Sequence, residues 1–492
     1  MIEELNIRLA AEDFDDVEFK KLHFFTHSDE QVLRRLIVAG PVLLRGPRGS
    51  GKSAFMKSAH MKMKNEDSNI FSAYFSLRHF PLLTAKADNY LLILVPFISN
   101  LLQKELSEQN LNCEINFKSI TNTDELKSAL TELSVVLHRR IVLMFDDVAH
   151  IGRETSLAGF FDFFRTLSSS VVSCKAAIYP GVTKFGSRFD FYSDATIIEA
   201  QRDERSSDFA EFFEKILNSR HPGLLDKTDS KLKEILATFL GRAVLGNVRA
   251  FNSLCSELDK HPNITVIIVG DTLKWLSSDY LYPALEELST KLGAYTPMLK
   301  IAESIAPIIF KDCGKQKVNA ILVQREHLQR IGKVFEILEY TGFIAKREAS
   351  RSLSKSGSGR GPRYAISLGP LFEKIHGVTL SYDLMDSLLR ISVPNEELVE
   401  YSATSELQEF TSPVPDEDIP IDVLSLPVSK LEVSKLMPYG LTQLMITSLK
   451  NGGYETVEDV VKVSVEELKL LEGIWDSKAR RIRNAVEQAI WM

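Results

Sequence analysis

The sequence is short of cysteine and contains neither a long apolar run nor a basic leader. Its four cysteines lie far apart, in the spacing of neither a zinc site nor a disulfide framework, so we expect four ordinary thiols in a reduced compartment. No run of about 18 apolar residues is present that could cross a bilayer. The acidic start Met1–Leu5 also lacks the basic beginning of a signal peptide. These absences predict a cytoplasmic protein with no membrane partner.

Positive charge is also in the minority, since the formal net charge is −7. The deficit is concentrated in residues 393–429, which contain nine acidic side chains and neither Lys nor Arg. Without that segment the formal charge changes from −7 to +2. The negative total therefore does not exclude a nucleic-acid partner.

The chain of 492 residues is too long for one hydrophobic core, and its first third alternates between two patterns. Helical patterns at 125–138 and 160–167 lie between short apolar runs. The predicted strands are 42–45, 70–77, 141–145, 171–179 and 196–198. Strands that alternate with helices indicate a parallel sheet covered on both faces. We therefore assign residues 1–202 to an α/β nucleotide-binding domain.

Four further segments follow this domain. Residues 203–278 are helical throughout and predict a small lid. Residues 279–392 place a helix at 327–340 before a hairpin of 343–345 and 364–366, which is the order of a winged helix. The acidic segment 393–429 is predicted to be a flexible linker. Residues 430–492 predict a compact all-α module, which makes the whole chain a multidomain α/β protein.

A glycine-rich turn carries the clearest chemical signal. The pattern G-x-x-x-x-G-K-S follows the first predicted strand and precedes a helix. Its residues are Gly46, Pro47, Arg48, Gly49, Ser50, Gly51, Lys52 and Ser53. Glycines let the backbone amides surround a phosphate chain at a helix amino terminus. Lys52 would contact the β- and γ-phosphates and Ser53 would bind magnesium, so the turn predicts ATP and Mg²⁺ as cofactors.

A pair of carboxylates supplies the second half of such a site. The apolar run 141–145 ends in Asp146 and Asp147. Asp146 would hold the magnesium shell, and Asp147 would polarise the attacking water. The alternative for Asp147 is a helix N-cap.

The chain resembles the initiator (origin-recognition) clade of AAA+ ATPases in three features. These are the two motifs, a strand at 70–77 that falls between the two motif strands along the chain, and the winged helix that follows. The resemblance extends over about residues 24–372, and the STAND signalling ATPases are a related possibility. It implies an AAA+ ATPase. Many AAA+ enzymes carry glutamate where this chain has Asp147, so we expect slow, switch-like hydrolysis.

The same resemblance implies roles for residues outside the motifs. Arg249, within 246–251, would contact the γ-phosphate, and a solvated arginine is the alternative. The first sensor would lie near 179–183, with Thr183 as the candidate. Arg188 would act as an arginine finger on a neighbour's ATP, which implies a homo-oligomer. Three other arginines compete for that role: Arg165, Arg202 and Arg205.

Two basic clusters predict contact with duplex DNA. The first follows the winged-helix pattern, and its alternative is a disordered basic loop. Its residues are Lys346, Arg347, Arg351, Lys355, Arg360 and Arg363, with Arg325, Arg330 and Lys333 flanking the preceding helix. The second lies in the C-terminal module, which resembles the helix-hairpin-helix domain of the bacterial RNA polymerase α subunit. Its residues are Gly473, Lys478, Arg480, Arg481 and Arg483.

In that family a second glycine follows two residues after the first, where this chain has Trp475. Such modules also dock proteins, so both partners remain open. The first functional hypothesis is an ATPase that assembles on DNA and recruits a partner such as a nuclease. The second is an ATP-gated signalling switch that resembles the STAND proteins, with antiphage defence as one setting, whose C-terminal module binds a protein.

Overall fold

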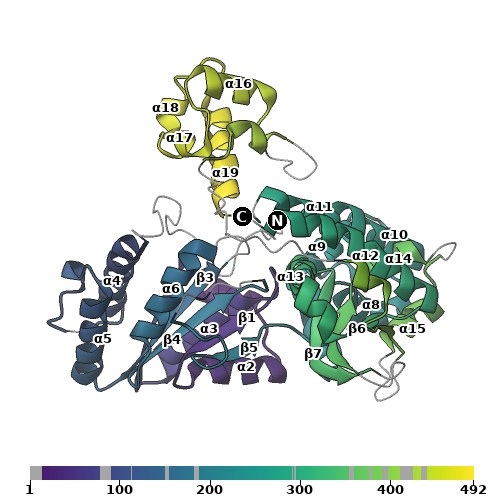
Figure 1. Cartoon of the computed structure of the whole chain (residues 1–492), viewed down its shortest axis with the longest axis horizontal. Helices are drawn as coiled ribbons and strands as arrows, with labels where there is room; N and C mark the ends of the chain where they lie inside the picture. Colours follow the sequence, from purple (N-terminus) through teal and green to yellow (C-terminus); the bar gives the residue numbers. More distant parts are fainter. Residues whose placement is uncertain are drawn as a thin grey trace.

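The computed structural model describes residues 14–77, 90–111, 113–149, 154–181, 185, 188–290, 292, 295–353, 359–375, 379–390, 397–410, 425–433 and 440–491. These residues form a multidomain α/β protein with a five-stranded sheet, a four-stranded sheet and a helical module near the C-terminus (Figure 1). Among the helices in these ranges, none has the length and apolar character needed to cross a bilayer.

The five-stranded sheet has the order β2-β3-β4-β1-β5, and every neighbouring pair is parallel. Its strands are β1 (Val42–Arg45), β2 (Ile70–Ser76), β3 (Arg140–Ala149), β4 (Val172–Ile178) and β5 (Thr196–Glu199). All five predicted strands are confirmed, and β3 is longer than expected. Strand β2 lies between the two motif strands only along the chain, since in the sheet it is the edge strand and β4 separates β1 from β3.

Helices cover both faces of this sheet (Figure 1). They are α2 (His27–Ile37), α3 (Lys52–Glu66), α4 (Tyr90–Glu108), α5 (Thr123–Leu137) and α6 (Glu154–Leu167), whereas α1 (Asp16–Leu22) contacts the later helix Phe209–Arg220. Val42 and Leu44 of β1 pack into one core with Phe55 of α3. Leu43, which points to the opposite face, packs into a second core with Phe160 of α6. This two-sided burial fixes the carboxyl ends of β1, β3 and β4 along one edge.

The predicted lid and the segment after it share one apolar core. The lid helices are α7 (Phe209–Arg220), α8 (Ser230–Ala243), α9 (Val248–Asp259) and α10 (Val266–Trp275). The following elements include α11 (Tyr282–Glu287), α12 (Thr296–Gln316), α13 (Arg325–Thr341), α14 (Leu368–Lys374) and α15 (Tyr382–Leu389). Phe239 of α8, Phe310 of α12 and Phe335 of α13 belong to the same buried cluster. The two segments are therefore packed together rather than joined only by chain.

The hairpin after α13 is longer than the sequence predicted. Its strands β7 (Ile344–Ser352) and β8 (Arg360–Ile366) include most of the basic cluster for which a disordered loop was the alternative. The four-stranded sheet has the order β7-β8-β6-β9, in which β6 (Ala320–Val323) and β9 (Val399–Tyr401) were not predicted.

Strand β9 corrects the prediction of a linker at 393–429. It pairs in parallel with β6, and its Val399 and Tyr401 are buried in the shared core together with Leu407. These apolar side chains lie between the acidic residues and anchor 397–410 to the fold. The rest of the predicted linker that precedes residue 425 lies outside the described residues.

The C-terminal module has a small core of its own, built from residues such as Leu441, Leu449 and Ile482. Its elements are η11 (Val428–Leu431), α16 (Gln443–Asn451), α17 (Val457–Val461), α18 (Val465–Leu468) and α19 (Asp476–Trp491). Figure 1 shows these helices as a separate body. The expected four thiols are also confirmed, because all four cysteines are free and only Cys113 is not fully buried.

Candidate functional site

The glycine-rich turn leaves the end of β1 and leads directly into α3. The Gly46 amide donates to Ile178 O of β4 at 3.2 Å, and an added Cβ at Gly46 would lie 2.8 Å from Ala200 O. Gly49 and Gly51 have φ values of +84° and +93°, which L side chains rarely adopt. The loop therefore requires glycine at these positions, and it holds its backbone at the amino terminus of a 15-residue helix.

Lys52 is buried at the start of α3. Its Nζ donates to Gly46 O at 2.9 Å and to Pro47 O at 3.0 Å, and lies 3.7 Å from the centroid of the Tyr179 ring. Burial lowers the Lys52 pKa to about 7, although the Asp147 and Asp146 carboxylates act in the opposite direction. The ammonium group thus lies within the loop, close to the paired carboxylates.

Asp146 lies toward the carboxyl end of β3, and its side chain is buried, with the residue 1% exposed. Its carboxylate accepts hydrogen bonds from the Tyr74 hydroxyl at 2.6 Å and from the Asp147 amide at 2.9 Å, and the Ser53 hydroxyl also hydrogen-bonds it. Burial and the neighbouring Asp147 charge raise the Asp146 pKa. A serine hydroxyl and a carboxylate in contact form an oxygen donor set that suits Mg²⁺, so these residues fit the expected metal.

Asp147 lies at an irregular position of β3 with φ +57°, a left-handed conformation that Asp tolerates better than most residues. Its Oδ1 accepts a hydrogen bond from the Tyr179 hydroxyl at 3.0 Å. Because Asp147 is inside a strand, the alternative of a helix N-cap is wrong.

The lid contacts the glycine-rich turn through the amino terminus of α9. The Asn247 side chain donates to Arg48 O at 2.7 Å, and the Val248 amide donates to Gly49 O at 3.1 Å. Arg249 follows, and its positive charge lowers the Lys52 pKa further. Although Arg249 is exposed, it lines the same cavity as Lys52.

That cavity is lined by both cationic and apolar groups. Lys52, Arg202, Arg220 and Arg249 supply the positive charge, beside Gly49, Gly51 and Ser53 of the glycine-rich turn. The apolar lining comes from Leu22, Phe24, Phe25, Phe212, Ile216 and Val248, and His23 and Asn252 add polar groups. This lining suits a ligand that carries both a phosphate chain and a flat base.

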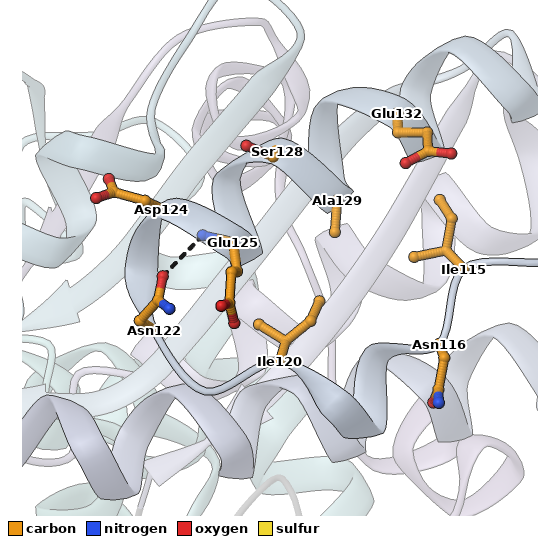
Figure 2. Close-up of a pocket in the computed structure, with 9 residues that line it drawn as sticks. All are labelled: Ile115, Asn116, Ile120, Asn122, Asp124, Glu125, Ser128, Ala129 and Glu132. Carbon is orange, nitrogen blue, oxygen red and sulfur yellow. Dashed lines mark hydrogen bonds between the residues drawn. The ribbon is translucent and has the colours of Figure 1, made fainter.

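A second hollow lies at the start of α5 (Figure 2). Asp124, Glu125 and Glu132 are among the residues that line it, and none of its lining residues is Lys or Arg. An anionic phosphate chain would therefore be repelled from this surface.

The arginines considered for the finger role have different surroundings. Arg188 is exposed, and it lies between β4 and β5 along the chain. Arg165 pairs with Asp194 at 3.2 Å. Arg202 donates to Ser50 O and Asp29, while Arg205 pairs with Asp203 and Glu348. Arg202 and Arg205 are thus engaged within this chain, whereas Arg188 is accessible to a neighbour.

Two of the predicted DNA-contacting arginines are buried. Arg347 Nε lies 2.7 Å from Glu204 Oε2, and Arg363 Nη1 lies 3.9 Å from Glu204 Oε1. With side chains 2% and 1% exposed, they cannot contact DNA in this conformation, so that prediction is wrong for both. The physical reason is the buried Glu204 carboxylate, which needs positive charge around it.

Of the other hairpin cations, Lys346 is exposed near the start of β7, and Arg351 and Arg360 lie near the hairpin tip. Arg360 is exposed and donates to Ser350 and Ser352, and Arg351 is partly exposed. Lys355 lies outside the described residues.

The cations of the C-terminal module contact its own chain. Lys478 donates to Gly473 O at 2.7 Å and Arg481 donates to Gly440 O at 2.8 Å. Arg480 pairs with Asp476 at 2.9 Å. Gly473 has φ +77°, which is typical of the tight turn that was predicted there.

Tyr179 is one of two site tyrosines that the sequence analysis did not name, the other being Tyr74, which donates to Asp146. Tyr179 follows β4 directly, at the edge where the carboxyl ends of the motif strands meet, and this position was the signal that could have identified it. Thr183, the residue considered instead, lies outside the described residues.

No family model matches the sequence, and no curated protein matches it significantly. Its fold is similar to that of the Walker-type ATPase PABY2304 of Pyrococcus abyssi, with 13% identity and a TM-score of 0.42 over 72% of this chain and 96% of that one. It is also similar to the ORC2 protein of Aeropyrum pernix, with 11% identity and a TM-score of 0.36 over 74% and 93%. A third similar structure is the Aeropyrum pernix ORC1 protein in complex with DNA, with 14% identity and a TM-score of 0.32 over 70% and 91%.

The two Aeropyrum pernix structures are ORC proteins, the type that the sequence resembles, and the Pyrococcus abyssi protein is a Walker-type ATPase. At TM-scores below 0.5, the likeness alone establishes neither an activity nor a partner for this chain. The α/β fold rests instead on the parallel sheet, with the glycine-rich turn after β1 and the carboxylate pair in β3.

Proposed function

We propose that this protein is an AAA+ ATPase that binds ATP with Mg²⁺ and hydrolyses it slowly. The observation that carries the proposal is that Lys52, which lines one cavity together with Arg249, lies close to the Asp146 and Asp147 carboxylates. Lys52 and the loop amides bind the phosphates, and Ser53 and Asp146 hold the metal. When bound, Mg²⁺ supplies charge neutralisation to the phosphate oxygens.

Asp147 orients the attacking water in this proposal. One of its carboxylate oxygens accepts a hydrogen bond from the Tyr179 hydroxyl at 3.0 Å, which orients the carboxylate. Asp is shorter than Glu, so its carboxylate reaches less far toward the attacking water. The shorter side chain supports slow turnover and a switch rather than a motor. Arg249 stabilises the γ-phosphate, and Arg188 completes the site of a neighbouring copy in a homo-oligomer.

Calorimetry with ATP and Mg²⁺ tests the binding site. Lys52→Ala should abolish binding, and Asp147→Asn should bind ATP normally without turnover. Lys62→Ala is a matched control, because Lys62 lies on the same helix and pairs with Glu30 at the surface. Normal ATP binding by Lys52→Ala, or normal hydrolysis by Asp147→Asn, would contradict the assignment.

We further propose that the ATP-bound protein assembles on duplex DNA through the hairpin tip and recruits a partner such as a nuclease. Arg351 and Arg360 support this, because both are accessible near the ends of the paired strands β7 and β8. Phosphate contacts of this kind require accessible cations rather than a sequence-reading surface.

A second candidate is an ATP-gated switch whose C-terminal module binds a protein. The observation that favours it is the exposure of Leu444, Leu470 and Trp475, which are 54%, 84% and 65% exposed. Lys478 and Arg481, which would be needed for phosphate, donate to backbone carbonyls nearby. If Trp475→Ser leaves DNA affinity unchanged but removes capture of a partner protein, this candidate is preferred for the module.

A further inference from the structure

Helix α13 contacts the catalytic edge of the parallel sheet at three points. Glu339 accepts from Arg45 at 2.9 Å and from Gln201 at 2.9 Å, which attaches the helix to the ends of β1 and β5. Lys333 donates to the carbonyl of Gly181, in the loop after β4. The Tyr340 ring lies 5.4 Å from the Tyr179 ring, between centroids.

Lys333 and Tyr340 are seven residues apart, so two helical turns place them on the same face of α13. That face is directed toward the loop after β4. Both tyrosines are nearly covered, with Tyr340 5% and Tyr179 9% exposed. The aromatic pair is therefore a packed contact rather than a surface encounter.

Tyr179 connects this contact to the chemistry. Its hydroxyl donates to Asp147 at 3.0 Å, and its ring lies 3.7 Å from Lys52 Nζ. A shift of the Tyr179 ring would move both the hydroxyl and the face that the ammonium group contacts. Tyr340 of α13 is the aromatic neighbour that opposes such a shift.

We propose that Tyr340 is a positioning residue for ATP hydrolysis: its ring holds Tyr179 in the orientation that directs the hydroxyl to Asp147. Turnover then depends on the packing of α13 against the loop after β4, and a ligand that displaces α13 changes the rate. The inference rests on the proposed ATPase function. It gives helix α13, which lies outside the α/β domain, a part in the chemical step.

The test compares ATP affinity with single-turnover rate in full-length variants. Tyr340→Ala should lower the rate about tenfold or more, because misplacement of a catalytic group by a fraction of an ångström is costly, while the Kd for ATP stays within twofold. Tyr340→Phe keeps the ring and should retain the wild-type rate. Gln329→Ala is the matched control on α13, since Gln329 is exposed.

A double variant tests the route through Tyr179. Tyr179→Phe removes the hydroxyl and should lower the rate to a similar degree. If Tyr340 acts through Tyr179, the double variant Tyr179→Phe/Tyr340→Ala should be no more than about twofold slower than the slower single variant. Multiplicative losses would overturn the proposal.

Three other outcomes would overturn the proposal that Tyr340 positions Tyr179. They are a wild-type rate in Tyr340→Ala, equal rate losses in Tyr340→Phe and Tyr340→Ala, and a Kd for ATP that rises in step with the rate loss. If thermal melting shows that Tyr340→Ala is not folded, Tyr340→Leu replaces it, with the same expected rate and Kd for ATP. If the wild type binds no ATP or never hydrolyses it, the proposed function fails instead, which distinguishes the two results.

Discussion

The Nε of Arg347, on strand β7, lies 2.7 Å from the Oε2 of Glu204, and both side chains are 2% exposed. Glu204 also pairs with Arg242 of α8 at 2.8 Å. One buried carboxylate therefore joins the lid, the hairpin and the segment that leaves β5. The surrounding arginines lower the Glu204 pKa to about 2 even though burial acts in the opposite direction.

Removal of this charge should be strongly destabilising. We expect Glu204→Gln to lose about 3–5 kcal/mol of unfolding free energy, because buried arginines would be left uncompensated. The Glu204 pKa is lower when folded, so its contribution is complete above pH 4.5 and declines as the pH falls toward 2. Urea unfolding should show a constant difference in unfolding free energy between wild type and variant near neutral pH. That difference should become smaller as the pH falls below 4.5.

Glu199→Gln is the comparison for that experiment, because Glu199 pairs with Arg45 but is 50% exposed. It should cost clearly less than Glu204→Gln. Equal losses for the two variants would show that burial of Glu204 has no special effect.

Local pattern was sufficient to predict the parallel sheet and the phosphate loop, because each signal lies within about ten consecutive residues. The burial of Arg347 and Arg363 was not predictable in this way. Their partner Glu204 is more than 140 residues away along the chain, so the hairpin looked like a solvent-exposed basic loop. Strand β9 was missed for a related reason. It has only three residues, it lies among acidic neighbours, and its partner β6 is far away in the sequence.

Binding of ATP should take up a proton above neutral pH. Burial lowers the Lys52 pKa to about 7, whereas phosphate oxygens favour the charged ammonium. At pH 8 the free protein must therefore protonate Lys52 on binding, and at pH 6 it is already protonated. Calorimetry in buffers of different ionisation enthalpy should report uptake of up to one proton at pH 8 and less at pH 6. The association constant should fall by as much as about tenfold per pH unit above 7. Affinity that does not change between pH 6 and 8.5 would contradict this.

Substitution of Gly49 should separate backbone strain from steric contact. An alanine Cβ there would lie 2.4 Å from Asn247 Oδ1 and 2.8 Å from Arg249 Cβ, in addition to adopting φ +84°. We expect Gly49→Ala to weaken ATP binding by at least tenfold, because α9 must move away from the loop. Gly40→Ala is the matched control, since Gly40 has φ +98° but no atom within 4 Å of the added carbon. It should cost about 1 kcal/mol of stability from strain alone and leave ATP affinity unchanged. Equal ATP affinities for the two variants would exclude the steric contact as the cause.

The hairpin arginines should divide into two groups when duplex DNA is titrated by fluorescence anisotropy over a range of salt concentrations. Arg351→Ala and Arg360→Ala should each weaken binding and reduce the slope of log K against log salt by about one, as expected for a lost phosphate contact. Arg347→Ala should instead lower the thermal midpoint, because it breaks the buried pair with Glu204. DNA binding by this hairpin would be excluded if the Arg351 and Arg360 variants kept the wild-type slope. A reduced slope in a folded Arg347→Ala protein would mean that the hairpin opens when it meets DNA.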